Sequence, residues 1–180
     1  YCLFLYKDFS TQTLNEDAQF KKLQQADLPL KGHGVHTYEH LRSVTAAYYA
    51  SGNPVLKSAL DHFIRKINRA TTPSGAPVGD EFAGGRAGDA TTTGYEFCSL
   101  HELMAGWISI LNKTGEASYG DRAEKILFNA AAGATHPDKS AICYLKTDNT
   151  YILSGGKHGD TTDKHQTRYR YSPVHREAAV

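Results

Sequence analysis

Two stretches of the sequence share one layout, and this repeat constrains the fold more than any other feature. Residues 45–70 and 109–134 each read as a helix, a small residue or threonine followed by glycine, a short turn and a second helix. The unit recurs after about sixty residues, and a lone helical hairpin of this kind cannot bury its apolar face. Repeated hairpins therefore predict stacked helix pairs in a solenoid or a toroid, and we favour the toroid.

Hydrophobic periodicity gives the expected elements. Apolar residues at spacings of three or four predict packed helices over residues 33–50, 55–70, 95–111 and 119–132. The more polar residues 11–26 are expected to form a solvent-facing helix. Near the C-terminus, residues 141–145 and 150–153 are short and β-prone, which predicts a small β-hairpin on the helical body. Residues 154–180 lack periodicity and are expected to form an irregular loop near the functional site.

Charge and composition favour a neutral ligand. Lys plus Arg number 20 against 19 for Asp plus Glu, so there is no electrostatic case for nucleic acid or for an anionic membrane. No apolar run approaches the ~20 residues that span a bilayer. The 11 tyrosines offer apolar faces with hydrogen-bonding tips, which suit sugar rings and also ordinary half-buried cores. Only three cysteines occur, too few for a disulfide framework.

A long loop, residues 71–93, contains the first candidate for catalysis. Loops of this length are uncommon unless they are functional, and this one contains Gly79-Asp80-Glu81. A partly desolvated pocket favours the neutral form of a carboxyl group, which can then protonate a glycosidic oxygen near neutral pH. Asp80 and Glu81 are therefore candidate acids. The alternative is that the pair forms a solvated turn.

A candidate metal site follows the loop. Glu96 and Cys98 offer oxygen and sulfur, a pair suited to zinc, although two more ligands would be required. Positions i and i+2 of a helix point about 200° apart, so both can reach one ion only if the backbone at Glu96 is not yet helical. The alternative is a buried cysteine together with a glutamate that favours the positive end of the helix dipole.

A third group, His33, His36, Glu39 and His40, is dense in polar side chains at a helix start. His36 and His40 share a face at i and i+4, yet this spacing without a catalytic Glu between the histidines has low specificity for a metal. We expect the four residues to bind a sugar by hydrogen bonds. The alternative is ordinary histidines, with Glu39 paired to Arg42 three residues on.

Four segments resemble one family. They are HGVHTYEHLR (33–42), GDEFAGG (79–85), TTTGYEFCSLHELM (91–104) and TGEASYGDRAEKILFNAAAGA (114–134). In this order they resemble the β-L-arabinofuranosidase-like glycoside hydrolases of family 127, formerly a domain of unknown function. The resemblance runs from about Lys31 to the C-terminus, and the most specific elements are GDE and Glu-x-Cys.

The resemblance implies an all-α, (α/α)6-barrel fold with added β elements, of which this chain would be one part, truncated at both ends. It implies zinc held by Glu96, Cys98 and two adjacent cysteines, one of which attacks the anomeric carbon with retention of configuration. Glu81, or Asp80 as second choice, would be the acid/base. The expected reaction is exo-cleavage of a terminal furanose, such as L-arabinofuranose, from plant glycans.

The sequence departs from the family in one respect, because its 180 residues contain no adjacent cysteine pair. Residues 169–175 resemble the approach to that pair, so we expect the chain alone to be inactive. Two alternatives stay open: a non-catalytic carbohydrate-binding toroid, and an α/α-barrel hydrolase or lyase that uses two carboxylates. The compartment, whether secreted, periplasmic or cytoplasmic, and the oligomeric state are not assigned.

Overall fold

The computed structural model describes residues 1–89, 93–135, 142–148, 152–153, 168–169 and 171–172. The helices are α1 (Cys2–Thr11), α2 (Phe20–Leu23), α3 (Gly34–Ser51), α4 (Pro54–Arg69), α5 (Phe97–Thr114), α6 (Ala117–Lys125), the π-helix η1 (Ile126–Ala131) and α7 (Ala132–Ala134). The strands have two residues each: β1 (Tyr95–Glu96), β2 (Ile142–Cys143), β3 (Leu145–Lys146), β4 (Ile152–Leu153), β5 (Arg168–Tyr169) and β6 (Tyr171–Ser172).

Both predicted hairpins are present, and local chemistry explains their turns. α3 ends at Gly52, whose φ of 64° is left-handed and whose N–H bonds to the Tyr48 carbonyl. Asn53 then caps α4 by accepting a hydrogen bond from Val55 N at 2.9 Å. α5 ends in the same way at Gly115, with φ of 70°. The helix–glycine–helix layout of the repeat is therefore confirmed.

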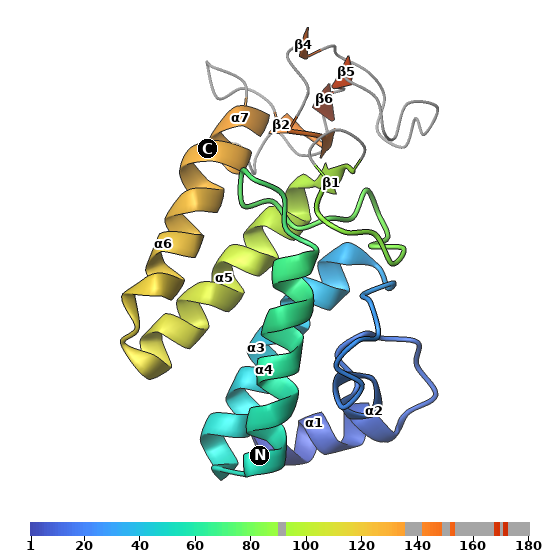
Figure 1. Ribbon diagram of the computed structural model, residues 1–180, viewed down its shortest axis with the longest axis vertical. Coiled ribbons are helices and arrows are strands. Elements are labelled where there is room, and N and C mark those ends of the chain that lie inside the picture. Colours follow the sequence, from blue (N-terminus) through green and yellow to red (C-terminus); the bar gives the residue numbers. More distant parts are fainter. Residues whose placement is uncertain (90–92, 136–141, 149–151, 154–167, 170, 173–180) are drawn as a thin grey trace.

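The hairpins stack against each other to form the body of the molecule. α3 packs against α4 and α5, and α5 packs against α6, while α1 lies across α3 (Figure 1). α3 and α5 approach closely at Gly106, where an added Cβ would lie 2.8 Å from Cδ2 of Leu41. The core between these helices includes Tyr38, Phe63 and Trp107. The arrangement is that of part of a helical barrel, which confirms the all-α fold class.

The expected helix over residues 11–26 is wrong. α1 ends at Thr11, residues 12–19 form a loop, and α2 is a single turn. Two polar side chains in this stretch, Asp17 and Gln19, are buried and bond to backbone groups: the Gln19 amide donates to the carbonyls of Phe9 and Gln12. Such bonds offer the backbone an alternative to the helix. Periodicity alone did not reveal them.

The short strands gather at one end of the helical body (Figure 1). Two antiparallel pairs, β1–β3 and β2–β6, and one parallel pair, β4–β5, are present among the described residues. The short strands expected near the C-terminus are confirmed. Among the described residues, β3 pairs with β1, and β2 pairs with β6. The Phe97 amide also donates to the Tyr144 carbonyl at 2.9 Å. The rest of the tail, 154–180, lies mostly outside the described residues.

Candidate active site

Three segments converge at the strand-bearing end of the molecule. The loop of residues 71–93 is bonded to the start of α3, because Gly34 N donates to the Glu81 carbonyl at 2.7 Å. The same loop is bonded to the start of α5, because Glu96 N donates to the Gly79 carbonyl at 3.0 Å. Glu81, Glu96 and the residues that begin α3 are therefore brought together by backbone hydrogen bonds.

Glycine permits this convergence. Gly79 has φ of 150°, and a Cβ at this position would lie 3.3 Å from Cα of Gly34. A Cβ on Gly34 would in turn lie 2.9 Å from Oγ of Ser99 in α5. The two glycines let the backbone of the loop approach the start of α3, and Gly34 also leaves room for the Ser99 side chain of α5.

Glu81 has an unusual backbone. Its φ of 91° is the one positive value at a non-glycine position among the described residues, and residues held in such conformations cluster at functional sites. Its Oε1 accepts a hydrogen bond from the Tyr144 hydroxyl at 2.8 Å, and its Oε2 lies 3.4 Å from Nε2 of His33. The Glu81 side chain is 31% exposed, so solvent or a ligand can reach it.

Glu96 lies beside this group in a drier environment. It is 3% exposed, and its Oε2 has no hydrogen-bond partner among the described residues. Burial, together with the nearby negative charge of Glu81, raises the pKa of Glu96, although a hydrogen bond with Tyr144 partly offsets the effect. One ligand atom from each of His33, Glu81 and Glu96 lies within 4.8 Å of the others, so these three could hold a metal ion.

Cys98 lies in the first turn of α5, next to Glu96 but outside that three-residue group. The backbone at Glu96 is extended, with φ of −94° and ψ of 141°, as a shared ion would require. Burial and the charge of Glu96, to which the thiol is hydrogen-bonded, raise the pKa of Cys98 to about 12. The thiol is therefore protonated at neutral pH unless a cation displaces its proton.

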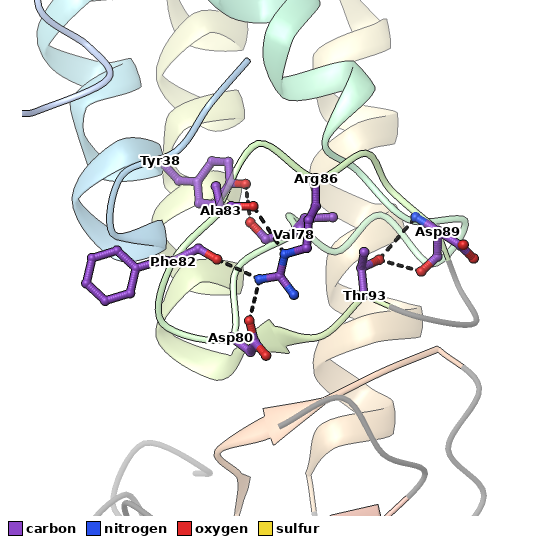
Figure 2. Close-up of polar contacts among 8 residues, drawn as sticks. All are labelled: Tyr38, Val78, Asp80, Phe82, Ala83, Arg86, Asp89 and Thr93. Atoms are coloured by element: carbon purple, nitrogen blue, oxygen red, sulfur yellow. Dashed lines mark hydrogen bonds and ion pairs between the residues drawn. The ribbon is translucent and has the colours of Figure 1, made fainter. Parts of the chain in front are cut away.

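Asp80 has different surroundings from Glu81. It is 4% exposed and forms an ion pair with the Arg86 guanidinium (Figure 2). The same guanidinium donates to the carbonyls of Phe82 at 2.6 Å and Ala83 at 3.3 Å. The Asp80–Arg86 pair thus closes the loop on itself and stabilises its turn.

The four residues expected to bind a sugar, His33, His36, Glu39 and His40, do not form one group in the structure. His33 joins Glu81, and the exposed ring of His36 lies 4.8 Å from the His33 ring, edge to face. Glu39 is exposed on α3. The ring of His40 instead stacks on Phe9 of α1, with ring centroids 4.6 Å apart. Of these four residues, His33 therefore contacts Glu81 directly and His36 contacts the ring of His33.

Two contacts in this region differ from sequence expectation. Arg42 pairs with Glu102 of α5, so the alternative in which Glu39 holds Arg42 is wrong. The Tyr144 hydroxyl contacts Glu81, yet Tyr144 was not among the candidate site residues. The sequence indicated only that the stretch around it is β-prone. Burial and the hydrogen bond to Glu81 raise the pKa of Tyr144 well above its ordinary value. No local motif could have revealed this role.

The fold and site define a helical-barrel protein with a cluster of acidic and histidine side chains at one end. No family model and no curated protein matches the sequence. Among solved structures, the chain is similar to a GH127 β-L-arabinofuranosidase from Geobacillus stearothermophilus T6, with a TM-score of 0.58 and 17% identity over 70% of this chain. It is also similar to the GH127 β-arabinofuranosidase BT3674, with a TM-score of 0.64 and 16% identity over 80% of this chain.

These similarities show a shared fold. The chain spans 20% and 24% of the lengths of the two solved proteins, so it corresponds to about a fifth to a quarter of each. In the described part of the chain, no helix has the length and apolar character needed to cross a membrane.

Proposed function

We propose that this chain is part of a glycoside hydrolase resembling the family 127 β-L-arabinofuranosidases, which removes a terminal furanose from an arabinose-containing plant glycan. The observation that carries the proposal is the position of Glu81, between Tyr144 and His33 and beside Glu96, in a fold shared with two β-arabinofuranosidases. Residues 1–180 are then part of a single (α/α)6-barrel catalytic domain.

Glu81 is the proposed acid/base. It donates a proton to the glycosidic oxygen as the bond to the anomeric carbon breaks, and it later takes a proton from the water that releases the sugar. Tyr144 holds one oxygen of Glu81 and leaves the other facing His33. Asp80 is the weaker candidate, because Arg86 already occupies its carboxylate. The sugar contacts with best support are His33 and His36; Glu39 and His40 lack contacts that tie them to Glu81.

Glu96 and Cys98 are the residues that would hold zinc. The donors fit the ion, because Glu96 has a buried oxygen without a partner among the described residues and Cys98 is hydrogen-bonded to the same carboxylate. When bound, zinc keeps a cysteine thiol in its thiolate form. The proposed nucleophile, one of two adjacent cysteines, is absent from these 180 residues, so activity is proposed for the whole protein.

The test is hydrolysis of aryl and alkyl β-L-arabinofuranosides by the whole protein. Glu81→Gln should lower kcat/KM by roughly 10²–10⁴-fold, more for the alkyl glycoside, whose poor leaving group needs protonation. Glu124→Gln, an exposed change on α6, is the matched control. NMR should show the β-anomer as the first product. Full activity of Glu81→Gln, or an inverted product, contradicts the proposal.

The carboxylate pair supports a second candidate. The ligand oxygens of Glu81 and Glu96 lie within 4.8 Å of each other, and carboxyl groups about 5–5.5 Å apart are typical of retaining glycosidases with a carboxylate nucleophile. In this alternative Glu96 attacks the sugar and no zinc is needed. Chelation separates the two candidates, since it abolishes the activity of the zinc enzyme and spares that of the carboxylate enzyme.

A further inference from the structure

A buried carboxylate lies in the loop between α1 and α2, a region in which the sequence offered no functional motif. Asp17 is 4% exposed. Its Oδ2 accepts three hydrogen bonds: from Lys31 N at 2.7 Å, from Gly32 N at 2.6 Å and from Thr37 Oγ1 at 3.1 Å. Hydrogen bonds to an ionised group are roughly twice as strong as neutral ones. Asp17 therefore fixes the backbone just before His33.

Gly32 makes the approach possible. A Cβ at this position would lie 3.1 Å from Oδ2 of Asp17 and 3.2 Å from Oγ1 of Thr37. Both atoms belong to the hydrogen bonds just described. A side chain here would have to displace the carboxylate or the hydroxyl.

The segment that Asp17 holds is also the partner of the loop that contains Glu81. Four backbone bonds join them: Gly34 N to Glu81 O at 2.7 Å, Ala83 N to Gly32 O at 2.9 Å, Gly84 N to Lys31 O at 3.3 Å and Gly85 N to Leu30 O at 2.8 Å. Across this ladder, His33 is bridged to Phe82. The backbone that Asp17 fixes is thus bonded directly to Glu81 and to the residues that follow it.

The loop that contains Asp17 is itself held in place. The Tyr6 hydroxyl donates to the Ala18 carbonyl at 2.8 Å, and the Gln19 amide donates to Phe9 O at 3.1 Å. The neighbouring Glu16 contacts Nδ1 of His36 at 3.3 Å. A carboxylate anchored in this way can impose a position on the segment it binds.

We propose that Asp17 is a positioning residue for the candidate active site. By holding the amides of Lys31 and Gly32, it sets the separation between the His33 ring and the Glu81 carboxylate. Its effect on geometry is independent of any reaction, and only its effect on turnover rests on the proposed function. The competing interpretation is that Asp17 contributes to global stability alone.

Amide hydrogen exchange in the chain tests the proposal. Asp17→Ala should speed exchange at Gly34 and Ala83 roughly 100-fold, because the charge-assisted bonds that order this segment are lost. Asp17→Asn keeps an oxygen acceptor and should speed exchange at the same two amides roughly 10-fold. This variant is also the test if Asp17→Ala does not fold. Thr45→Val is the matched control, because it removes a buried hydrogen bond, from Thr45 Oγ1 to the Leu41 carbonyl within α3, and leaves the loop that contains Asp17 unchanged. It should leave these two amides unchanged.

Two further readouts separate positioning from stability. The ring-nitrogen NMR shifts of His33 at fixed pH should change in both Asp17 variants and not in Thr45→Val. In the whole enzyme, Asp17→Asn should lower kcat about 10-fold with little change in KM.

If amide exchange in α5, for example at Trp107, is accelerated as much as at Gly34 and Ala83, the effect is global and the proposal is overturned. Unchanged exchange at Gly34 and Ala83 would also overturn it. If exchange and ring shifts change as expected but no form of the protein hydrolyses a glycoside, the proposed function fails and the positioning role stands.

Discussion

The left-handed backbone of Glu81 predicts an inverted order of stability between glycine and alanine. At φ of 91°, a side chain with a Cβ costs roughly 1–2 kcal/mol. The greater entropy of glycine in the unfolded chain opposes this by roughly 0.5–1 kcal/mol. Both Glu81→Gly and Glu81→Ala remove the carboxylate. The difference between their free energies of unfolding therefore measures the effect of the backbone conformation alone. The glycine variant should be more stable by about 1 kcal/mol.

Urea unfolding followed by circular dichroism measures this difference. With a slope of about 2 kcal/mol/M, the glycine variant should unfold at roughly 0.5 M higher urea than the alanine variant. Relative to the native chain, Glu81→Gly loses the Tyr144 hydrogen bond, worth about 1 kcal/mol, and regains a similar amount from relieved strain. Its stability should therefore stay within about 1 kcal/mol of the native value. An alanine variant as stable as the glycine variant would refute the reasoning.

Three other predictions concern the loop, the helix contact and the proposed metal ligands. Asp80→Asn removes the negative charge that faces the partly exposed Arg86 guanidinium. It should lower the free energy of unfolding in thermal or urea unfolding by about 2 kcal/mol, less than the roughly 3–5 kcal/mol of a fully buried pair; a loss below about 0.5 kcal/mol would contradict the ion pair. Gly106→Val should destabilise by about 1–3 kcal/mol through overpacking between α3 and α5, whereas Gly120→Ala on α6, where a Cβ meets only an ordinary contact at 3.5 Å, should stabilise by up to about 1 kcal/mol. In the whole protein, Cys98→Ser should weaken zinc binding, measured by calorimetry, by more than the roughly 10–100-fold that loss of an outer-shell partner costs, and Cys2→Ser should leave it unchanged.

Sequence patterns predicted the helical body because the relevant signals are local. Apolar spacing placed α3, α4 and α5, and glycines such as Gly52 and Gly115 marked helix ends where a left-handed residue is needed. The helix over residues 11–26 failed for a related reason. Two of its polar side chains, Asp17 and Gln19, are buried and bond to backbone groups that only the folded chain brings near, so the spacing of polar residues appeared typical of a solvent-facing helix.

The candidate site was predictable in composition but not in arrangement. Motif chemistry drew attention to Asp80, Glu81, Glu96 and Cys98, yet gave no means of ranking adjacent carboxylates. The structure separates Asp80 from Glu81, because one pairs with Arg86 and the other with Tyr144. These partners lie six and 63 positions away in the sequence.

The sequence by itself determined the helical hairpins, the glycine-rich loop and the kinds of donor atom available. Only the tertiary structure decided which carboxylate faces His33, that Tyr144 completes the group, and that Asp17 fixes the backbone beside it. The physical reason is the sequence separation over which each kind of interaction acts. Helix periodicity and turn chemistry act over a few residues, whereas these side chains meet through hydrogen bonds between segments 14 to 63 residues apart.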